Sequence, residues 1–259
     1  MKKPFILKAI LISFLVVFLV TPSVMATQIQ IGYPGSGYGM YSFSGGGEFT
    51  VKPDADPNWI PILDSYDSKA KNIGVSGTFQ TFCMESNEYI SVYPASYVVV
   101  FNDRAMYGLN YPNGDPLSVG TAWLYHEFQS GTLKVQTATG DIYKYDYEDM
   151  SHGRLTDAAL LQNTIWWLEG ETDDPGNSNP FRYAVVSMFG ESGAMADNNG
   201  QYRVRVLNLW EIGHEGQFGY RHQDLLVCEP VNTPEPATLL LLGSGLLGLA
   251  GIVRKRFKK

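Results

Sequence analysis

The chain has 259 residues, a formal net charge of −7 and two cysteines. Three of its 19 basic residues precede residue 27 and five lie in the last six positions, whereas 25 of its 26 acidic residues lie within residues 27–232, so this segment has a charge near −14. Such an acidic surface repels nucleic acid and anionic lipid and excludes both as favoured partners. The segment is long enough to bury one substantial core.

Residues 1–26 have the three parts of a secretory signal peptide. Three lysines precede an apolar run, and small residues, Val24 and Ala26, occupy the −3 and −1 positions of a cleavage site. The apolar run is short for a membrane span of about 20 residues, which argues against the alternative of an N-terminal anchor. We therefore expect export and cleavage between Ala26 and Thr27.

The exported body, residues 27–228, is predicted to be mainly β. Its glycine-rich start, which also contains tyrosine and phenylalanine, is expected to form turns between early strands. Seven later segments combine aromatic and β-branched residues with flanking turn residues, which is typical of strands. These segments are 47–51, 77–85, 96–102, 131–140, 140–148, 202–210 and 224–230.

Helices are predicted between some of these strands. Residues 121–131 form a short helical pattern with Thr121 before it and Gly131 after it, and a second pattern has Asn179 as N-cap and Pro180 at the first helical position. Helices inserted among strands favour an α+β fold, mainly an antiparallel sheet or barrel with a few inserted helices.

The stretch "DAALLQNTIWWLEGE" predicts a further helix with a polar residue on its apolar face. Thr156 or Asp157 can act as N-cap, and Gly170 stands where a C′ glycine is expected. Burying the Gln162 amide without a partner would cost about 1–3 kcal/mol, so we expect Gln162 to have a partner. A hydrogen bond to a neighbouring backbone carbonyl is the simplest way to satisfy it. The apolar neighbours of Gln162 on this face are Leu155, Ala158, Ala159, Ile165 and Trp166.

The cysteines, histidines and acidic residues leave several types of site open. Two cysteines in an exported body invite a Cys83–Cys228 disulfide, and a buried free thiol is the alternative. The acidic stretch 171–179 lacks the spacing of an EF-hand, and the histidines are too far apart for a local zinc motif. We therefore expect no metal and no cofactor. The histidines are His126, His152, His214 and His222.

Two motifs together resemble the thioester (TQXA-like) domains of bacterial surface adhesins. Residues 82–85, "FCME", match an aromatic–Cys–apolar–acidic motif, and residues 162–166, "QNTIW", match a helical Gln-x-small-Ile-Trp motif. Thr164 stands where alanine is commoner, and Leu161 where threonine is commoner. The resemblance covers residues 75–228.

This resemblance implies an internal thioester between Cys83 and Gln162, formed with loss of ammonia. Phe82, Trp166 and Trp167 are the expected aromatic shield, because an exposed thioester would hydrolyse before meeting its target. An amine on a ligand would then attack the acyl carbon and become joined to Gln162. The acyl group is consumed, so the resemblance implies a protein that is not a turnover enzyme.

The C-terminal end combines three features in close succession. A linker, residues 229–236, is followed by an uncharged apolar segment, 237–253, and by a basic tail, 254–259. This pattern predicts a transmembrane helix with a cytoplasmic tail, although 17 residues is at the short limit for a span. The linker ends in the tripeptide Pro234, Glu235 and Pro236.

These features resemble the PEP-CTERM sorting signal of Gram-negative bacteria. The resemblance implies an exosortase-type transpeptidase as partner, membrane anchoring through the apolar helix before processing, and a final place at the cell surface or in the extracellular matrix. Such proteins often accompany exopolysaccharide and biofilm loci.

Two functions of different classes remain open. The first is an exported surface or matrix protein that attaches covalently to an amine-bearing partner through the Cys83–Gln162 thioester. The second is a non-covalent structural or carbohydrate-binding matrix protein, for which exopolysaccharide is the natural ligand. A secreted hydrolase is a weaker third reading, which the sequence alone does not reject, because 25 acidic residues are available to supply the two carboxylates that it needs.

Overall fold

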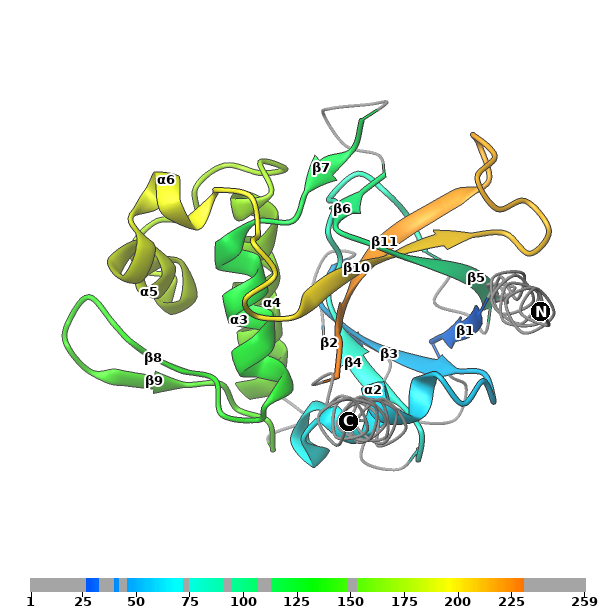
Figure 1. Cartoon of the computed structure of the whole chain (residues 1–259). Helices are drawn as coiled ribbons and strands as arrows, with labels where there is room; N and C mark the ends of the chain where they lie inside the picture. The colour runs from blue at the N-terminus through cyan, green and yellow to red at the C-terminus, as the bar shows by residue number, and fades with distance from the viewer. Residues whose placement is uncertain are drawn as a thin grey trace, which may run out of the picture.

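Most of the described strands belong to one antiparallel sheet that curls into a nearly closed barrel (Figure 1). The computed structural model describes residues 27–32, 40–41, 46–71, 75–90, 95–106, 113–148 and 153–230. The strand order is β11-β10-β5-β1-β3-β2, and β4 also pairs with β3. The strands are β1 (Thr27–Ile31), β2 (Met40–Tyr41), β3 (Glu48–Pro53), β4 (Phe79–Thr81), β5 (Ala95–Asn102), β10 (Val204–Trp210) and β11 (Arg221–Cys228).

The barrel closes where the chain beyond β4 meets β11. Cys83 forms an antiparallel bridge with Leu225, and the Leu226 N–H donates to the Phe82 carbonyl at 3.2 Å. On the opposite side of the ring, β1 pairs with both β3 and β5, so that Ile29 lies across from Tyr97. Closure satisfies backbone groups that an open sheet would leave unpaired at its edges.

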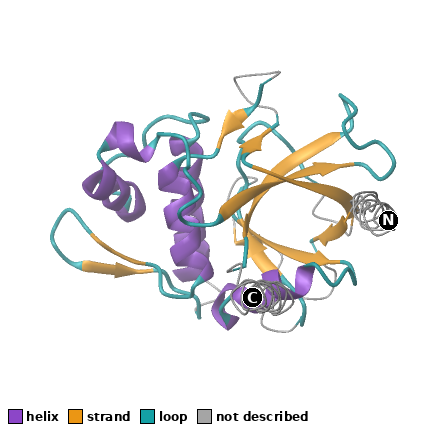
Figure 2. Cartoon of the chain, in the orientation of Figure 1, coloured by secondary structure: helices purple, strands orange, loops and turns teal. Residues whose placement is uncertain are grey.

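The helices gather mainly on one side of the barrel (Figure 2). Shorter elements complete the fold: α2 packs below the barrel in Figure 1, β6 pairs with β7, and β8 pairs with β9 as a hairpin beside the helices. The bounds are α2 (Trp59–Ser65), η2 (Ser68–Ala70), β6 (Arg104–Ala105), β7 (Asp115–Pro116), α3 (Val119–Gln129), β8 (Lys134–Gln136), β9 (Ile142–Lys144), α4 (Gly153–Leu168), α5 (Pro180–Phe189) and α6 (Glu191–Ala194).

Several predictions about the helix ends are confirmed. Asn179 caps α5, because its side-chain oxygen accepts from the N–H groups of Phe181 at 3.0 Å and Arg182 at 3.3 Å. Gly170 ends α4 with φ of 79°, and the bonds from Gly170 N to Trp167 O and from Glu171 N to Trp166 O make a Schellman motif.

Two predicted helix starts are wrong. The N-cap of α3 is Ser118, whose hydroxyl accepts from the Thr121 N–H, so Thr121 lies inside the helix. Helix α4 begins at Gly153, ahead of Thr156 and Asp157. Asp157 is buried, and its carboxylate accepts from the Asp146 N–H at 2.6 Å. The carboxylate therefore binds the segment after β9 and does not cap the helix.

A buried ion pair joins α4 to the barrel. Arg154, in the first turn of α4, donates through Nε to the Glu48 carboxylate of β3 at 2.9 Å and also pairs with it through Nη2. The guanidinium further donates to the Tyr147 and Lys69 carbonyls, and the Tyr145 hydroxyl donates to Glu48. Burial raises the pKa of Glu48, and Arg154 opposes that rise. This long-range pair explains why α4 extends further than its local sequence predicts.

The observed fold confirms the predicted class, a mainly antiparallel sheet or barrel with a few helices. All seven predicted strand segments contain a strand. The predicted signal peptide, sorting tripeptide, transmembrane helix and basic tail lie outside the described residues. Among the residues that are described, no helix has the length and apolar character needed to cross a membrane.

Candidate functional site

The site forms where the segment after β4 passes α4, at the seam of the barrel. Cys83 is fully buried, and its segment is held in register by the Leu225 bridge and by a bond from the Met84 N–H to the Asp224 carbonyl at 2.9 Å. Burial, and to a lesser extent the negative charge of Glu88, raises the pKa of the Cys83 thiol. Burial therefore keeps the sulfur away from water and disfavours its thiolate form.

Gln162 finds its predicted partner in the main chain of Cys83. The Cys83 N–H donates to Gln162 Oε1 at 3.0 Å, and Gln162 Nε2 donates back to the Cys83 carbonyl at 2.8 Å. A second N–H, from Gly47, donates to the same Oε1 at 2.9 Å. The Gln162 amide, a polar group on the apolar face of α4, is thus hydrogen-bonded to Cys83. The thioester-domain resemblance pairs these same two residues.

Two converging N–H groups make the Gln162 oxygen a place where negative charge would be stabilised. Backbone donors at 2.7–3.1 Å from a carbonyl oxygen are the geometry of an oxyanion hole, which favours a tetrahedral intermediate at the adjacent carbon. Sequence reasoning missed the Gly47 donor. The only local indication was the run of three glycines at 45–47, which lets the backbone approach a side chain closely.

Gly46, in the loop before β3, packs closely against both the Trp166 ring and the Gln162 side chain. A methyl group on Gly46 would lie 2.2 Å from the Trp166 ring and 2.9 Å from Gln162 Cγ, so only glycine fits there. The Trp166 ring is almost fully buried, and its N–H has no acceptor among the described residues. Trp166 and Gln162 thus both lie beside Gly46, and the shielding role of Trp166 stays a prediction.

The other two predicted shielding residues face different partners. Trp167 stacks under the Arg182 guanidinium of α5, 5.0 Å from the ring centre. Phe82 packs edge-on against Phe128 at 5.0 Å and against Tyr125 at 6.4 Å, both on α3. Both residues are buried and contribute to the dry surroundings, but no described contact places either ring on the Gln162 amide.

The predicted alternative of a Cys83–Cys228 disulfide does not fit the register. Both cysteines are free and buried. Cys83 lies opposite Leu225, three residues from Cys228 along β11, which corresponds to about 10 Å along a strand. A disulfide requires Cα atoms closer than about 7 Å. The register therefore argues against a disulfide between these two cysteines.

The remaining candidate residues serve structural contacts. In the acidic stretch 171–179, Asp174 pairs with Arg182, Asn179 caps α5, and the Glu171 carboxylate accepts from Ser86. The three described histidines lie apart: His126 lies against Tyr202, His214 stacks on Tyr220, and His222 lies against Tyr97. His152 lies outside the described residues.

Comparison with known proteins identifies the C-terminal end. Residues 232–256 match the PEP-CTERM protein-sorting motif. No curated protein matches the chain, and no solved structure does. The match contains the tripeptide of Pro234, Glu235 and Pro236 and the apolar segment that follows it. The chain therefore ends in a PEP-CTERM sorting signal, which implies processing by an exosortase and marks an exported protein of a Gram-negative bacterium.

Proposed function

We propose that this exported surface protein attaches covalently to an amine-bearing partner through a thioester between Cys83 and Gln162. The observation that carries the proposal is the reciprocal bonding of the Gln162 amide to the main chain of Cys83, with a second N–H from Gly47 on the same oxygen. The Gln162 amide is thus bound directly to the residue that carries the thiol, and both residues are buried.

The chemistry balances with the groups present. The Cys83 sulfur attacks the Gln162 side-chain carbon, the oxygen takes the negative charge under the two N–H groups, and the C–N bond breaks as the thiol proton leaves with the nitrogen as ammonia. An incoming amine then attacks the same carbon, and the thiol of Cys83 is regenerated. The partner is left joined to Gln162 by an amide, so one chain reacts once.

The surroundings support a stored acyl group. Cys83 and Gln162 are each about 1 % exposed, and the buried Trp166 ring lies against the same glycine, Gly46, as the Gln162 side chain, so water has little access to the bond. Loss of the NH₂ group would also release the Cys83 carbonyl, which accepts from it at 2.8 Å. A free carbonyl and the unpaired Trp166 N–H could then bind the arriving amine and its carrier.

The test is a methylamine reaction followed by intact mass spectrometry. Protein purified without reductant or amine buffer should weigh one ammonia less than its sequence, gain one methylamine on treatment, and expose one new thiol to iodoacetamide. Cys83→Ala and Gln162→Ala should abolish the adduct, whereas Cys228→Ala, which removes the other buried cysteine, should retain it. A fresh wild-type mass equal to the sequence value, without an adduct, would overturn the proposal.

A non-covalent carbohydrate-binding role is the second candidate. Tyr89 is 85 % exposed and Phe218 is 59 % exposed, and both line a cavity of about 330 Å³ together with Asn87 and Arg221. Exposed aromatic rings beside polar groups suit stacking on sugar rings. Retention of the wild type, and loss of retention by Tyr89→Ala, on an exopolysaccharide affinity matrix would favour this role if no thioester mass is found.

A further inference from the structure

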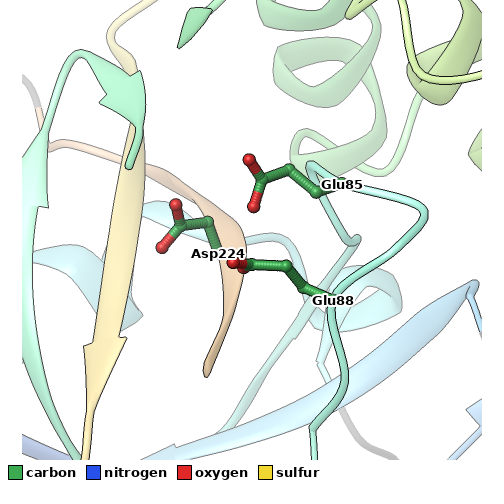
Figure 3. A group of neighbouring side chains, drawn as sticks. All are labelled: Glu85, Glu88 and Asp224. Atoms are coloured by element: carbon green, nitrogen blue, oxygen red, sulfur yellow. The ribbon is translucent and has the colours of Figure 1, made fainter. Parts of the chain in front are cut away.

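A cluster of three carboxyl groups lies next to Cys83. Glu85 and Glu88 come from the segment after β4, and Asp224 comes from β11 (Figure 3). One oxygen from each residue lies within 4.8 Å of the other two. The side chains extend from two separate segments into the same space, so the fold and not the local sequence brings them together.

The backbone on both sides of the cluster is fixed. Met84 donates its N–H to the Asp224 carbonyl, and the Gln223 side chain donates to the Glu85 carbonyl, both at 2.9 Å. Asp224 Oδ2 accepts from the Met106 N–H at 2.6 Å, which orients this carboxylate. The cluster is thus supported by main-chain bonds and not by mobile surface side chains.

The surroundings of Glu85 indicate independently that the cluster binds a cation. The residue is 1 % exposed, and neither of its carboxylate oxygens has a hydrogen-bond partner among the described residues. Glu88 Oε2 is buried without a partner as well. A buried carboxylate that lacks both donors and a counter-charge is costly, and such groups in proteins are usually paired or coordinate a metal ion.

We propose that Glu85, Glu88 and Asp224 bind one calcium ion. The donors are all oxygen, which suits a hard divalent cation. The ligand oxygens lie within 4.8 Å of one another and can converge on one cation with small side-chain adjustments. Ca²⁺ accepts irregular geometry at about 2.3–2.6 Å, whereas Mg²⁺ demands near-ideal octahedral geometry at about 2.1 Å, so Ca²⁺ suits this cluster better. This proposal departs from the sequence-based expectation that the chain holds no metal.

The surroundings give the ion an entrance and leave room for water ligands. Glu88 lines the cavity of about 330 Å³ that also contains Asn87 and Arg221. The charge of Arg221 acts on Glu88 and offsets part of the repulsion there. Glu85 forms no ion pair among the described residues, so the cation would supply the charge that Glu85 lacks.

The site would join the Cys83 segment to β11. Glu85 is two residues from Cys83, and Asp224 is next to Leu225, the bridge partner of Cys83. An ion held by both segments opposes their separation, so calcium binding is expected to stabilise the barrel seam.

The test compares thermal unfolding of the full-length chain, purified in non-ionic detergent, in EDTA and in 10 mM CaCl₂. Ligand binding to the folded state alone predicts a rise in Tm of about 5 °C for the wild type. Glu85→Gln and Asp224→Asn should abolish the rise while keeping a cooperative transition. Asp173→Asn, an exposed residue of the other acidic stretch, should retain it. An equal calcium shift in Glu85→Gln would overturn the proposal.

A shared proton is the competing explanation for the cluster, because Glu85 and Glu88 are close enough for one carboxyl to donate to the other. Equilibrium dialysis with radioactive calcium separates the two. One ion bound per wild-type chain, lost in Asp224→Asn, supports the metal site. No bound calcium at millimolar concentration would overturn it and leave the proton-sharing pair.

Discussion

Replacing Arg154 with methionine should test how strongly the helical side of the molecule depends on its ion pair with the barrel. Arg154 and Glu48 are both fully buried, and the guanidinium bonds Glu48 and two backbone carbonyls. Methionine retains much of the side-chain length but no donor, so Glu48 is left buried without its counter-charge. Breaking one half of a buried pair costs about 3–5 kcal/mol. For a body of this size that corresponds to a Tm lower by about 6–20 °C.

The effect should depend on pH in a defined direction. Burial already raises the pKa of Glu48 above its usual value, and loss of Arg154 removes the main opposing influence. The neutral form of Glu48 is favoured in the folded state, so its contribution is present at low pH and is lost as pH rises through the folded pKa. The deficit of Arg154→Met relative to the wild type should therefore be larger at pH 8 than at pH 5.

The assay is thermal unfolding of the full-length chain in detergent, followed by tryptophan fluorescence. The matched control is Glu48→Gln combined with Arg154→Met, which removes both charges and should recover part of the lost stability. A deficit below about 1 kcal/mol for Arg154→Met, the same at both pH values, would refute this reasoning, because a surface ion pair contributes that little.

Three further predictions address the site, the half-buried Glu169 and the sorting signal. Gly46→Ala should lower stability by about 1–3 kcal/mol and abolish the methylamine adduct, because the methyl group would overlap the Trp166 ring; an unchanged adduct would show that the loop yields freely. Burial raises the pKa of Glu169 to about 7, so the wild type should lose stability between pH 5 and 8 by at most about 1.4 kcal/mol per pH unit, and Glu169→Gln should flatten that slope; equal slopes would exclude this residue as the cause. Alanines at 234–236 should leave the protein in the membrane fraction and deplete it from the medium or matrix, and an unchanged distribution would contradict exosortase processing.

Local sequence signals predicted those elements whose ends and faces depend on neighbouring residues. Asn179 before Pro180 is a local N-cap, and Gly170 ends α4 because glycine adopts positive φ freely, so both ends were predictable. Seven strands were also predictable, because aromatic and β-branched residues between turn residues mark a single segment, whereas β1, β2, β6 and β7 were not among the predicted segments. The start of α4 was not, because Arg154 belongs to the helix through a partner 106 residues away.

The residues of the candidate site also fall into those that local sequence predicts and those that it does not. An amide on an apolar helix face predicts a buried partner, and the amide of Gln162 does bond Cys83 across 79 residues of sequence. Gly47 and Asp224 could not be found, because nothing near them in the chain indicates which side chain they meet. Contacts of this kind are set by strand register and barrel closure, which single-sequence patterns do not determine.

The most direct test of the account is a peptide map of the protein digested at mildly acid pH without amines or reductant. The account predicts that the peptides with Cys83 and Gln162 appear as one linked ion, lighter than their sum by one ammonia, while Cys228 is recovered as a free thiol. Separate peptides, with Cys83 carrying the alkylating reagent and Gln162 unchanged, would contradict it.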